Sequence, residues 1–247
     1  PPLTIPTIPP KYPDTSAITL TVSAATPDPV SVKPIPPPKA NWRFDLPASN
    51  INTACNQQML PQCTFADVVS ALKAGKVAED GSGEFKPIDV LIIPGGPGTR
   101  LNRIYDTNTP SNEVKVPNTQ EVQDPFVRHS IITVCTGSHV LSQTGLLDGR
   151  QVTTNSARYD DVAKQTGDVK WQRNRRWLRD SVPKDAMSDG LSLLPGVEIW
   201  SSAGITAGID VMLEFISEYY GGIEVGIETA KRMEYRWERE KEASYFL

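Results

Sequence analysis

An apolar segment that runs directly into a cysteine and a glycine constrains this chain more than any other part of its sequence. Residues 131–134 read Ile-Ile-Thr-Val, Cys135 follows, and Thr136 and Gly137 lead into a helix expected over 138–144. A residue on such a turn between strand and helix projects toward solvent while its backbone is held in a strained conformation. The pattern predicts a parallel sheet that carries Cys135 at its carboxyl edge.

A second apolar run, Ile88 to Ile93, ends at Pro-Gly-Gly-Pro-Gly over 94–98, which is typical of a buried parallel strand entering a tight loop. Strands and helices then alternate. We expect strands at 151–154, 169–171 and 197–201, and helices at 138–144 (ended by Gly145), 157–165, 206–219 and 224–241. This alternation predicts a mostly parallel sheet with helices on both faces.

The first part of the chain is different in character, because many of its 22 prolines fall in residues 1–50. We expect a strand at 17–25, an exposed excursion at 34–56, a short strand at 58–61 and a helix at 65–74. Residues 100–120 are expected to be a surface insertion, followed by a helix to about Arg128. Residues 1–247 are predicted to form a single α/β domain with these insertions.

Charge and hydropathy exclude two classes of function. No apolar run approaches the roughly 18 residues that a membrane span needs, so we expect no membrane partner. The net charge of -4 and the sequence pI of about 5.3 do not favour nucleic acid, and small molecules are the expected partners. The aromatic and basic stretch from Trp171 to Trp177 is accordingly interpreted as a half-exposed strand.

The three cysteines are Cys55, Cys63 and Cys135, and they lack the clustered spacing of a zinc site, so no metal is expected. Cys55 and Cys63 would pair in a secreted protein and remain thiols in a reducing compartment. Cytoplasmic and secreted locations both stay open, since no signal peptide is visible at the start.

Cys135 is the candidate nucleophile. The N–H groups of the helix that follows favour a thiolate, and the backbone amides of Gly96 and Thr136 are expected to converge on a developing oxyanion. The alternative is an inert cysteine at the end of a core strand. His139, one helical turn further on, would either approach the thiol or pack inside the helix, and His129 is expected at a helix C-terminus.

Four motifs in order resemble the ThiJ/PfpI superfamily (class I glutamine amidotransferase-like). They are Leu91–Gly98, Val134–Ser138, Gly145–Arg150 with Thr153–Asn155, and Ser202–Asp210. They are most similar to the branch of isocyanide hydratases and of amidotransferase-like domains in transcription regulators. The resemblance covers 85–240, whereas residues 1–50 match poorly. It implies a flavodoxin-like three-layer sandwich, a homodimer, Cys135 as nucleophile, Gly95, Gly96 and Thr136 around the anion site, and no cofactor.

Three departures from the family pattern stand out. Asn155 occupies a position where the isocyanide hydratase branch carries His, and Thr136 occupies the position of the peptidase His, which argues against a Cys-His peptidase. No segment between Pro1 and Ser16 matches the family's first strand and its acid. Asp14, Asp28 and Asp45 lack that context, so the acid stays unassigned. A processed start, an incomplete start and a loss of the chemistry are the explanations left open.

Three functions follow as hypotheses. The favoured one is isocyanide hydratase-like hydration or hydrolysis of a carbon–nitrogen bond by Cys135, which would make the chain a lyase or hydrolase. The second is glyoxalase-like conversion of methylglyoxal to lactate. The third is a non-catalytic redox-sensing or binding protein that uses Cys135. Thr206 and Asp210 are expected near the pocket, with Thr206 as a helix N-cap as the simpler interpretation.

Overall fold

The computed structural model describes residues 20–24, 27–31, 58–74, 88–96, 99, 127–164, 166–182 and 196–239. These residues fall into two compact units. The described residues between 19 and 87 make up the smaller unit, and those from 88 onward make up the larger. The single-domain organisation predicted for the chain stays a prediction.

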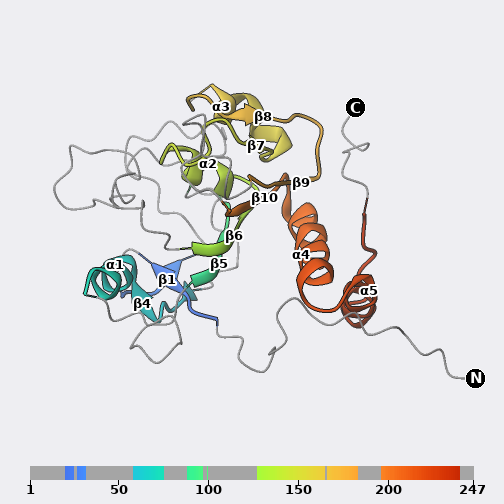
Figure 1. Ribbon diagram of the computed structural model, residues 1–247, viewed down its shortest axis with the longest axis horizontal. Coiled ribbons are helices and arrows are strands. Elements are labelled where there is room, and N and C mark those ends of the chain that lie inside the picture. Colours follow the sequence, from blue (N-terminus) through green and yellow to red (C-terminus); the bar gives the residue numbers. More distant parts are fainter. Residues whose placement is uncertain are drawn as a thin grey trace, which may run out of the picture. The chain divides into compact units, whose positions relative to one another are not determined.

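The larger unit is built on a four-stranded sheet in the order β5-β6-β10-β9 (Figure 1). The strands are β5 (Ile88–Ile93), β6 (Val127–Val134), β10 (Glu198–Ser202) and β9 (Trp177–Asp180). β5 and β10 are both parallel to β6, whereas β9 is antiparallel to β10. The carboxyl ends of β5, β6 and β10 therefore meet at one edge of the sheet, which is the edge that carries Cys135.

Helices cover both faces of this sheet. Alternate residues of each strand point to opposite faces, so Ile131 and Ile132 lie in two different clusters of buried apolar side chains. The cluster of Ile131 includes Leu141 of α2 (Gly137–Ser142). The cluster of Ile132 includes Val211 of α4 (Ile205–Tyr219). The predicted three-layer, flavodoxin-like α/β fold class is confirmed.

Aromatic side chains dominate the face covered by α4. The Trp177 and Trp200 rings stack with their centroids 6.0 Å apart, and the Phe215 ring meets Trp200 edge-on at 5.5 Å. Glu198 lies at the border of this cluster and accepts hydrogen bonds from Trp200 Nε1, the Tyr219 hydroxyl and Arg179. These three donors lower the pKa of Glu198 against the opposing effect of its partial burial, which is the largest single influence.

Beyond β6 and α2 the chain forms a small subsidiary sheet. β7 (Gln151–Val152) pairs in parallel with β8 (Lys170–Trp171), and the 3₁₀ turn η5 (Ser156–Arg158) and α3 (Tyr159–Ala163) lie between them in sequence. The buried Arg150 fixes this region to the main sheet. Its guanidinium donates to the Asp180 carboxylate and to the carbonyls of Asp180 and Val197.

The smaller unit contains two strand pairs and one helix. β1 (Ser23–Ala24) pairs in parallel with β4 (Cys63–Thr64), and β2 (Val30–Ser31) pairs antiparallel with β3 (Gln58–Met59). α1 (Phe65–Lys73) begins directly after Thr64, whose hydroxyl accepts from the Asp67 N–H at 3.1 Å. The Asp67 carboxylate accepts in return from the Thr64 N–H, which lowers the pKa of Asp67. This reciprocal pair is a helix-capping box.

Several predicted boundaries are wrong. β6 begins at Val127, so His129 lies within a strand and not at a helix C-terminus; Val127 is buried and pairs with Ile88, which extends the strand. The stretch from Trp171 to Trp177 is not one strand, because Asn174 turns the chain with a φ of 58° before β9 begins.

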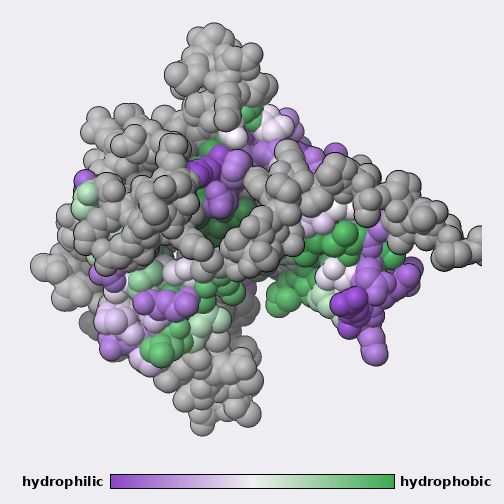
Figure 2. All heavy atoms as spheres, turned by 60° about the horizontal axis from the view of Figure 1, so that its bottom comes forward, coloured by the Kyte–Doolittle hydropathy of each residue, from purple (hydrophilic) through white to green (hydrophobic). Residues whose placement is uncertain are grey.

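The last helix is also shorter than predicted. α5 (Ile223–Arg232) ends at Arg232, because Glu234 adopts a φ of 50° and the Tyr235 N–H turns back to the Ala230 carbonyl. The outer face of α5 is hydrophilic, as the purple atoms on the right of Figure 2 show. Glu228 and Arg232 form an exposed ion pair there, four residues apart.

The excursion expected at 34–56, the insertion at 100–120 and Cys55 lie outside the described residues. β1 is shorter than the strand expected at 17–25, of which only 20–24 are described. Cys63 is a free thiol whose sulfur lies 3.1 Å from the Ser23 hydroxyl. Within the described residues, no helix is long and apolar enough to cross a membrane.

Candidate functional site

Cys135 sits on the strained turn that its sequence context predicted. It follows β6 directly and adopts a φ of 56°, a left-handed conformation that costs free energy for any residue with a Cβ. The surrounding backbone holds it there. The Cys135 N–H donates to the Ser202 carbonyl at 3.0 Å, and the Cys135 carbonyl accepts from the hydroxyls of Ser138 and Thr154. The side chain remains half-buried.

Two glycines allow the loop after β5 to approach this turn closely. A Cβ at Gly95 would lie 2.6 Å from the Val134 carbonyl oxygen and 2.7 Å from the Cys135 Cβ. A Cβ at Gly137 would lie 2.3 Å from the Ile93 carbonyl oxygen. Both positions exclude every side chain larger than hydrogen, so the backbones of β5 and of the turn are in direct contact.

A network of two hydroxyls joins the loop to the turn. Thr136 Oγ1 accepts from the Gly96 N–H at 3.2 Å, and Thr99 Oγ1 lies 2.7 Å from both Thr136 Oγ1 and the Gly96 carbonyl oxygen. Sequence reasoning singled out Gly96 and Thr136 but missed Thr99. The available signal was a hydroxyl residue placed directly after the glycine-rich loop.

The predicted anion-site residues lie together at the carboxyl edge of the sheet. Gly95 touches the turn, Gly96 bonds the Thr136 side chain, and Thr136 follows Cys135 directly. The Thr136 N–H makes no hydrogen bond within the described part of the chain. It is therefore a donor that an oxyanion at Cys135 could use. The roles of these residues stay predictions.

His139 is 3% exposed, in the interior of α2. Burial lowers its pKa from the ordinary value of 6.5, and a hydrogen-bonding contact with the backbone of Thr99 opposes that effect. The imidazole is thus held neutral at neutral pH beside the loop that carries the hydroxyl network. Of the two interpretations of His139, packing inside the helix agrees with this burial.

The other two predicted residues lie further along the same edge. Asn155 is half-buried and follows Thr154, the residue whose hydroxyl bonds the Cys135 carbonyl at 3.3 Å. Thr206 is exposed and is not the N-cap of α4, contrary to expectation, because the N-cap residue is Gly204. The helix begins at Ile205, one residue before Thr206, and the N-cap Gly204 is in an extended conformation.

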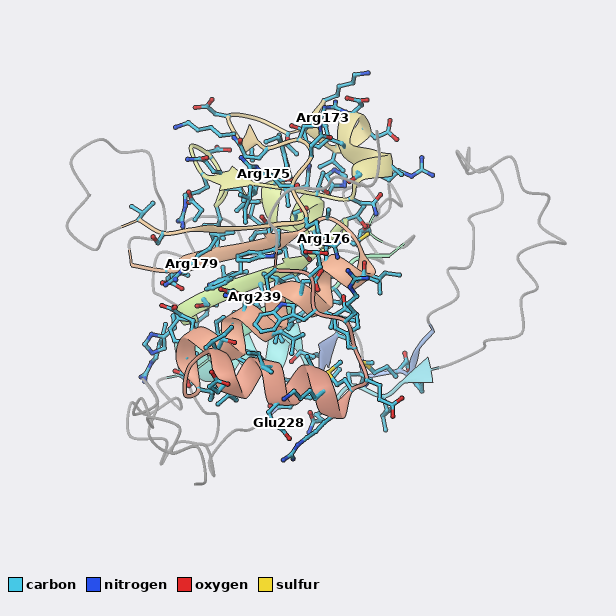
Figure 3. The ribbon with its side chains drawn as sticks, turned by 90° about the vertical axis from the view of Figure 1, so that its right-hand side faces the viewer. Arg173, Arg175, Arg176, Arg179, Glu228 and Arg239 are labelled. Atoms are coloured by element: carbon cyan, nitrogen blue, oxygen red, sulfur yellow. The ribbon has the colours of Figure 1, made fainter. Side chains whose placement is uncertain are left out.

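Asp210 holds two parts of the fold together through partners that could not be predicted from the sequence. Its carboxylate is completely buried and accepts from the Arg176 guanidinium, the Tyr235 hydroxyl and the Glu238 N–H. Figure 3 labels Arg176, just before β9. Burial, together with the hydrogen bond to Asp210, raises the pKa of Tyr235 to about 12. Asp210 thereby fixes the segment after α5 to the start of α4.

Three aspartates were candidates for the family's acid. Asp14 and Asp45 lie outside the described residues, and Asp28 is an exposed residue of the smaller unit. Among the described residues, no group of three or more His, Cys, Asp or Glu side chains is arranged to hold a metal ion.

Comparison with known proteins yields one curated relative and a set of similar folds. No family model matches the sequence. The isonitrile hydratase of Pseudomonas putida is 28% identical over 151 residues, which are 61% of this chain and 52% of that protein. The chain thus spans about half the length of the curated relative it matches.

Two solved structures are among those similar to this chain. A ThiJ/PfpI family protein from Pseudomonas syringae shares 20% identity at a TM-score of 0.50, covering 88% of this chain and 63% of that one. DJ-1beta of Drosophila melanogaster shares 16% identity at a TM-score of 0.43, covering 74% of this chain and 75% of that one.

The sequence similarity to the hydratase supports the resemblance seen in the four motifs. The Pseudomonas syringae protein has the same fold. The motif around Cys135 forms the strained turn between strand and helix that it predicted. In its motifs and in its fold, this chain resembles the ThiJ/PfpI superfamily.

Proposed function

We propose that this chain is a cysteine-dependent enzyme that hydrates the carbon–nitrogen multiple bond of an isocyanide, without a cofactor and with Cys135 as the nucleophile. The observation that carries the proposal is the strained backbone of Cys135, with a φ of 56° at the carboxyl edge of a parallel sheet. Strain of this kind collects at functional sites. The substrate class is suggested by the name of the Pseudomonas putida relative.

The reaction divides into two additions at one carbon. The Cys135 thiolate attacks the terminal carbon of R–N≡C, a carbon–sulfur bond forms, and a proton adds to the same carbon to give the thioimidate R–N=CH–S–Cys. Water then adds to that carbon, its proton going to nitrogen. Cleavage of the carbon–sulfur bond releases R–NH–CHO and returns the thiol, so that one water is consumed for each isocyanide.

The surrounding backbone is suited to the second half of this reaction. The intermediate R–NH–CH(OH)–S–Cys must lose its hydroxyl proton as the carbon–sulfur bond breaks, and negative charge then develops on oxygen. We assign the Thr136 N–H to that charge; the Gly96 N–H beside it holds the Thr136 hydroxyl. Gly95 allows the loop to approach, and none of Asn155, His139 and Thr206 is assigned a contact with substrate.

The test is product formation by the purified protein. Incubation with n-butyl isocyanide should yield N-butylformamide, detected by gas chromatography with mass spectrometry. Cys135→Ser should abolish the product, because a serine hydroxyl at this site is a much weaker nucleophile. The matched control is Cys63→Ser, which changes a free thiol of the smaller unit and should leave turnover unchanged.

The other outcomes decide between the remaining hypotheses. Turnover retained in Cys135→Ser would remove Cys135 from the mechanism. Formation of lactate from methylglyoxal, without formamide from the isocyanide, would favour the glyoxalase-like alternative. Stoichiometric oxidation of Cys135 by peroxide, with neither product, would favour the redox sensor. The homodimer that the family resemblance implies stays a prediction.

A further inference from the structure

The hydroxyl of Thr99 joins the two halves of the candidate site. Thr99 is 9% exposed, and its Oγ1 lies 2.7 Å from the Gly96 carbonyl oxygen and 2.7 Å from Thr136 Oγ1. The Thr99 N–H also points to the Gly96 carbonyl, at 3.3 Å. Thr99 therefore meets the loop through Gly96 and the turn of Cys135 through Thr136.

Several hydrogen bonds join these three residues. Thr136 Oγ1 accepts from the Gly96 N–H at 3.2 Å and can donate to the Gly96 carbonyl at 3.3 Å. A hydroxyl has one proton and two acceptor sites, so Thr99 donates to either the Gly96 carbonyl or Thr136 Oγ1. In both arrangements Thr136 Oγ1 is held on the loop through Gly96 and Thr99.

His139 approaches Thr99 from the helix side. The buried imidazole of His139 has a hydrogen-bonding contact with the Thr99 backbone, and burial keeps that ring neutral. His139 belongs to the same helix that begins immediately after Thr136. Thr99 is thus held between a side chain of α2 and the residue that precedes α2.

We propose that Thr99 is a positioning residue of the Cys135 site, which acts through Thr136 and the Gly96 peptide to set the donors of the anion site. The proposal rests on the proposed function for its catalytic consequence. Thr99 does not touch the substrate. Its hydroxyl keeps the Thr136 side chain and the Gly96 N–H in one place, so that the Thr136 N–H stays directed at the oxygen on the carbon bonded to Cys135.

Loss of the hydroxyl should affect the chemical step more than substrate binding. The donors act on charge that develops only as the carbon–sulfur bond breaks, so their displacement raises the barrier without weakening the ground-state complex. Displacements of about 1 Å in such sites cost up to about a hundredfold in rate. For a donor that is loosened rather than removed, we expect about a tenfold loss of kcat and a KM changed by less than about twofold.

The experiment compares Thr99→Val with Thr99→Ser in the full chain. Valine preserves the shape of the side chain and removes the hydroxyl, whereas serine keeps the hydroxyl. Two readouts are measured: kcat and KM with n-butyl isocyanide, and hydrogen exchange of the Gly96 amide by NMR. Thr99→Val should lower kcat about tenfold and speed exchange at Gly96. Thr99→Ser should restore both values to within about twofold of wild type.

The control is Thr144→Val, which removes a hydroxyl that bonds the Leu141 carbonyl at 2.7 Å just after α2. This variant should change neither readout. A Thr99→Val protein that folds, as judged by circular dichroism, and keeps wild-type kcat would overturn the proposal. If the wild type forms no formamide, the proposed function fails, and the exchange rate of Gly96 alone decides. Faster exchange in Thr99→Val then supports the role of Thr99, and unchanged exchange refutes it.

Discussion

Gly95 is the position where the smallest change should disturb the site most. Gly95→Ala adds one carbon, which would meet the Val134 oxygen at 2.6 Å, Cys135 Cβ at 2.7 Å and the Thr136 nitrogen at 2.8 Å. Ordinary contacts of a Cβ begin near 3.4 Å, so the loop or the turn must move by about 0.8 Å. None of these neighbours is the end of a flexible side chain, and the strain cannot be relieved by a rotamer change.

The consequence should appear in both stability and turnover. Overpacking of this kind costs about 1–3 kcal/mol of unfolding free energy. A shift approaching 1 Å at the nucleophile should lower kcat by roughly ten- to a hundredfold. Urea denaturation gives the first quantity and formamide production the second.

The matched control for this change is Gly167→Ala. Gly167 is exposed, and a Cβ there would meet only Asp148 Oδ1 at 3.7 Å, an ordinary contact. Alanine should therefore be neutral or stabilise the protein slightly, by reducing the freedom of the unfolded chain. A Gly95→Ala protein with the stability and turnover of Gly167→Ala would refute the inferred contact between the loop and the Cys135 turn.

Two further changes test the structure around the site. Asp210→Asn should lower the unfolding free energy by roughly 3 kcal/mol in urea denaturation, because it leaves the largely buried Arg176 without its counter-charge. The control, Glu228→Gln in the exposed ion pair with Arg232, should lower it by less than about 1 kcal/mol. The pKa of His139 in the folded protein is below the ordinary 6.5, so the unfolded chain binds more protons than the folded protein as the pH falls. The contribution of His139 to stability should therefore be full above about pH 6.5 and decline below it by at most about 1.4 kcal/mol per pH unit. His139→Gln should flatten this decline between pH 7.5 and 5.5, and an equal slope in both proteins would contradict the assignment.

The central sheet could be predicted because its strands are continuous apolar runs. β5 occupies the predicted residues Ile88 to Ile93, and β10 lies within one residue of the predicted strand at 197–201. A parallel strand that is covered on both faces consists almost entirely of apolar residues, so its ends are visible in the sequence. The turn at Cys135 could be predicted because Gly137 follows the end of the apolar strand β6 by only three residues.

Contacts between distant residues could not be predicted in the same way. Asp210 binds Tyr235 and the Glu238 N–H from another helix and its following segment, and no local pattern encodes that pairing. The early start of β6 was missed because Arg128 and His129 interrupt the apolar pattern, although their strand neighbours are buried. Position in the sheet decided that boundary, not local propensity.

The acid that the proposed reaction needs is not Asp210, although its motif brings it to the same edge as Cys135. Proton transfer requires a carboxyl that is free to reach the reacting group. One Asp210 oxygen is occupied by Arg176, and the other accepts from both the Tyr235 hydroxyl and the Glu238 N–H. Protonating this carboxylate would break a buried ion pair and at least one of these hydrogen bonds. A loss of turnover in Asp210→Asn would therefore report a displaced α4, and the proton must come from water or from another group.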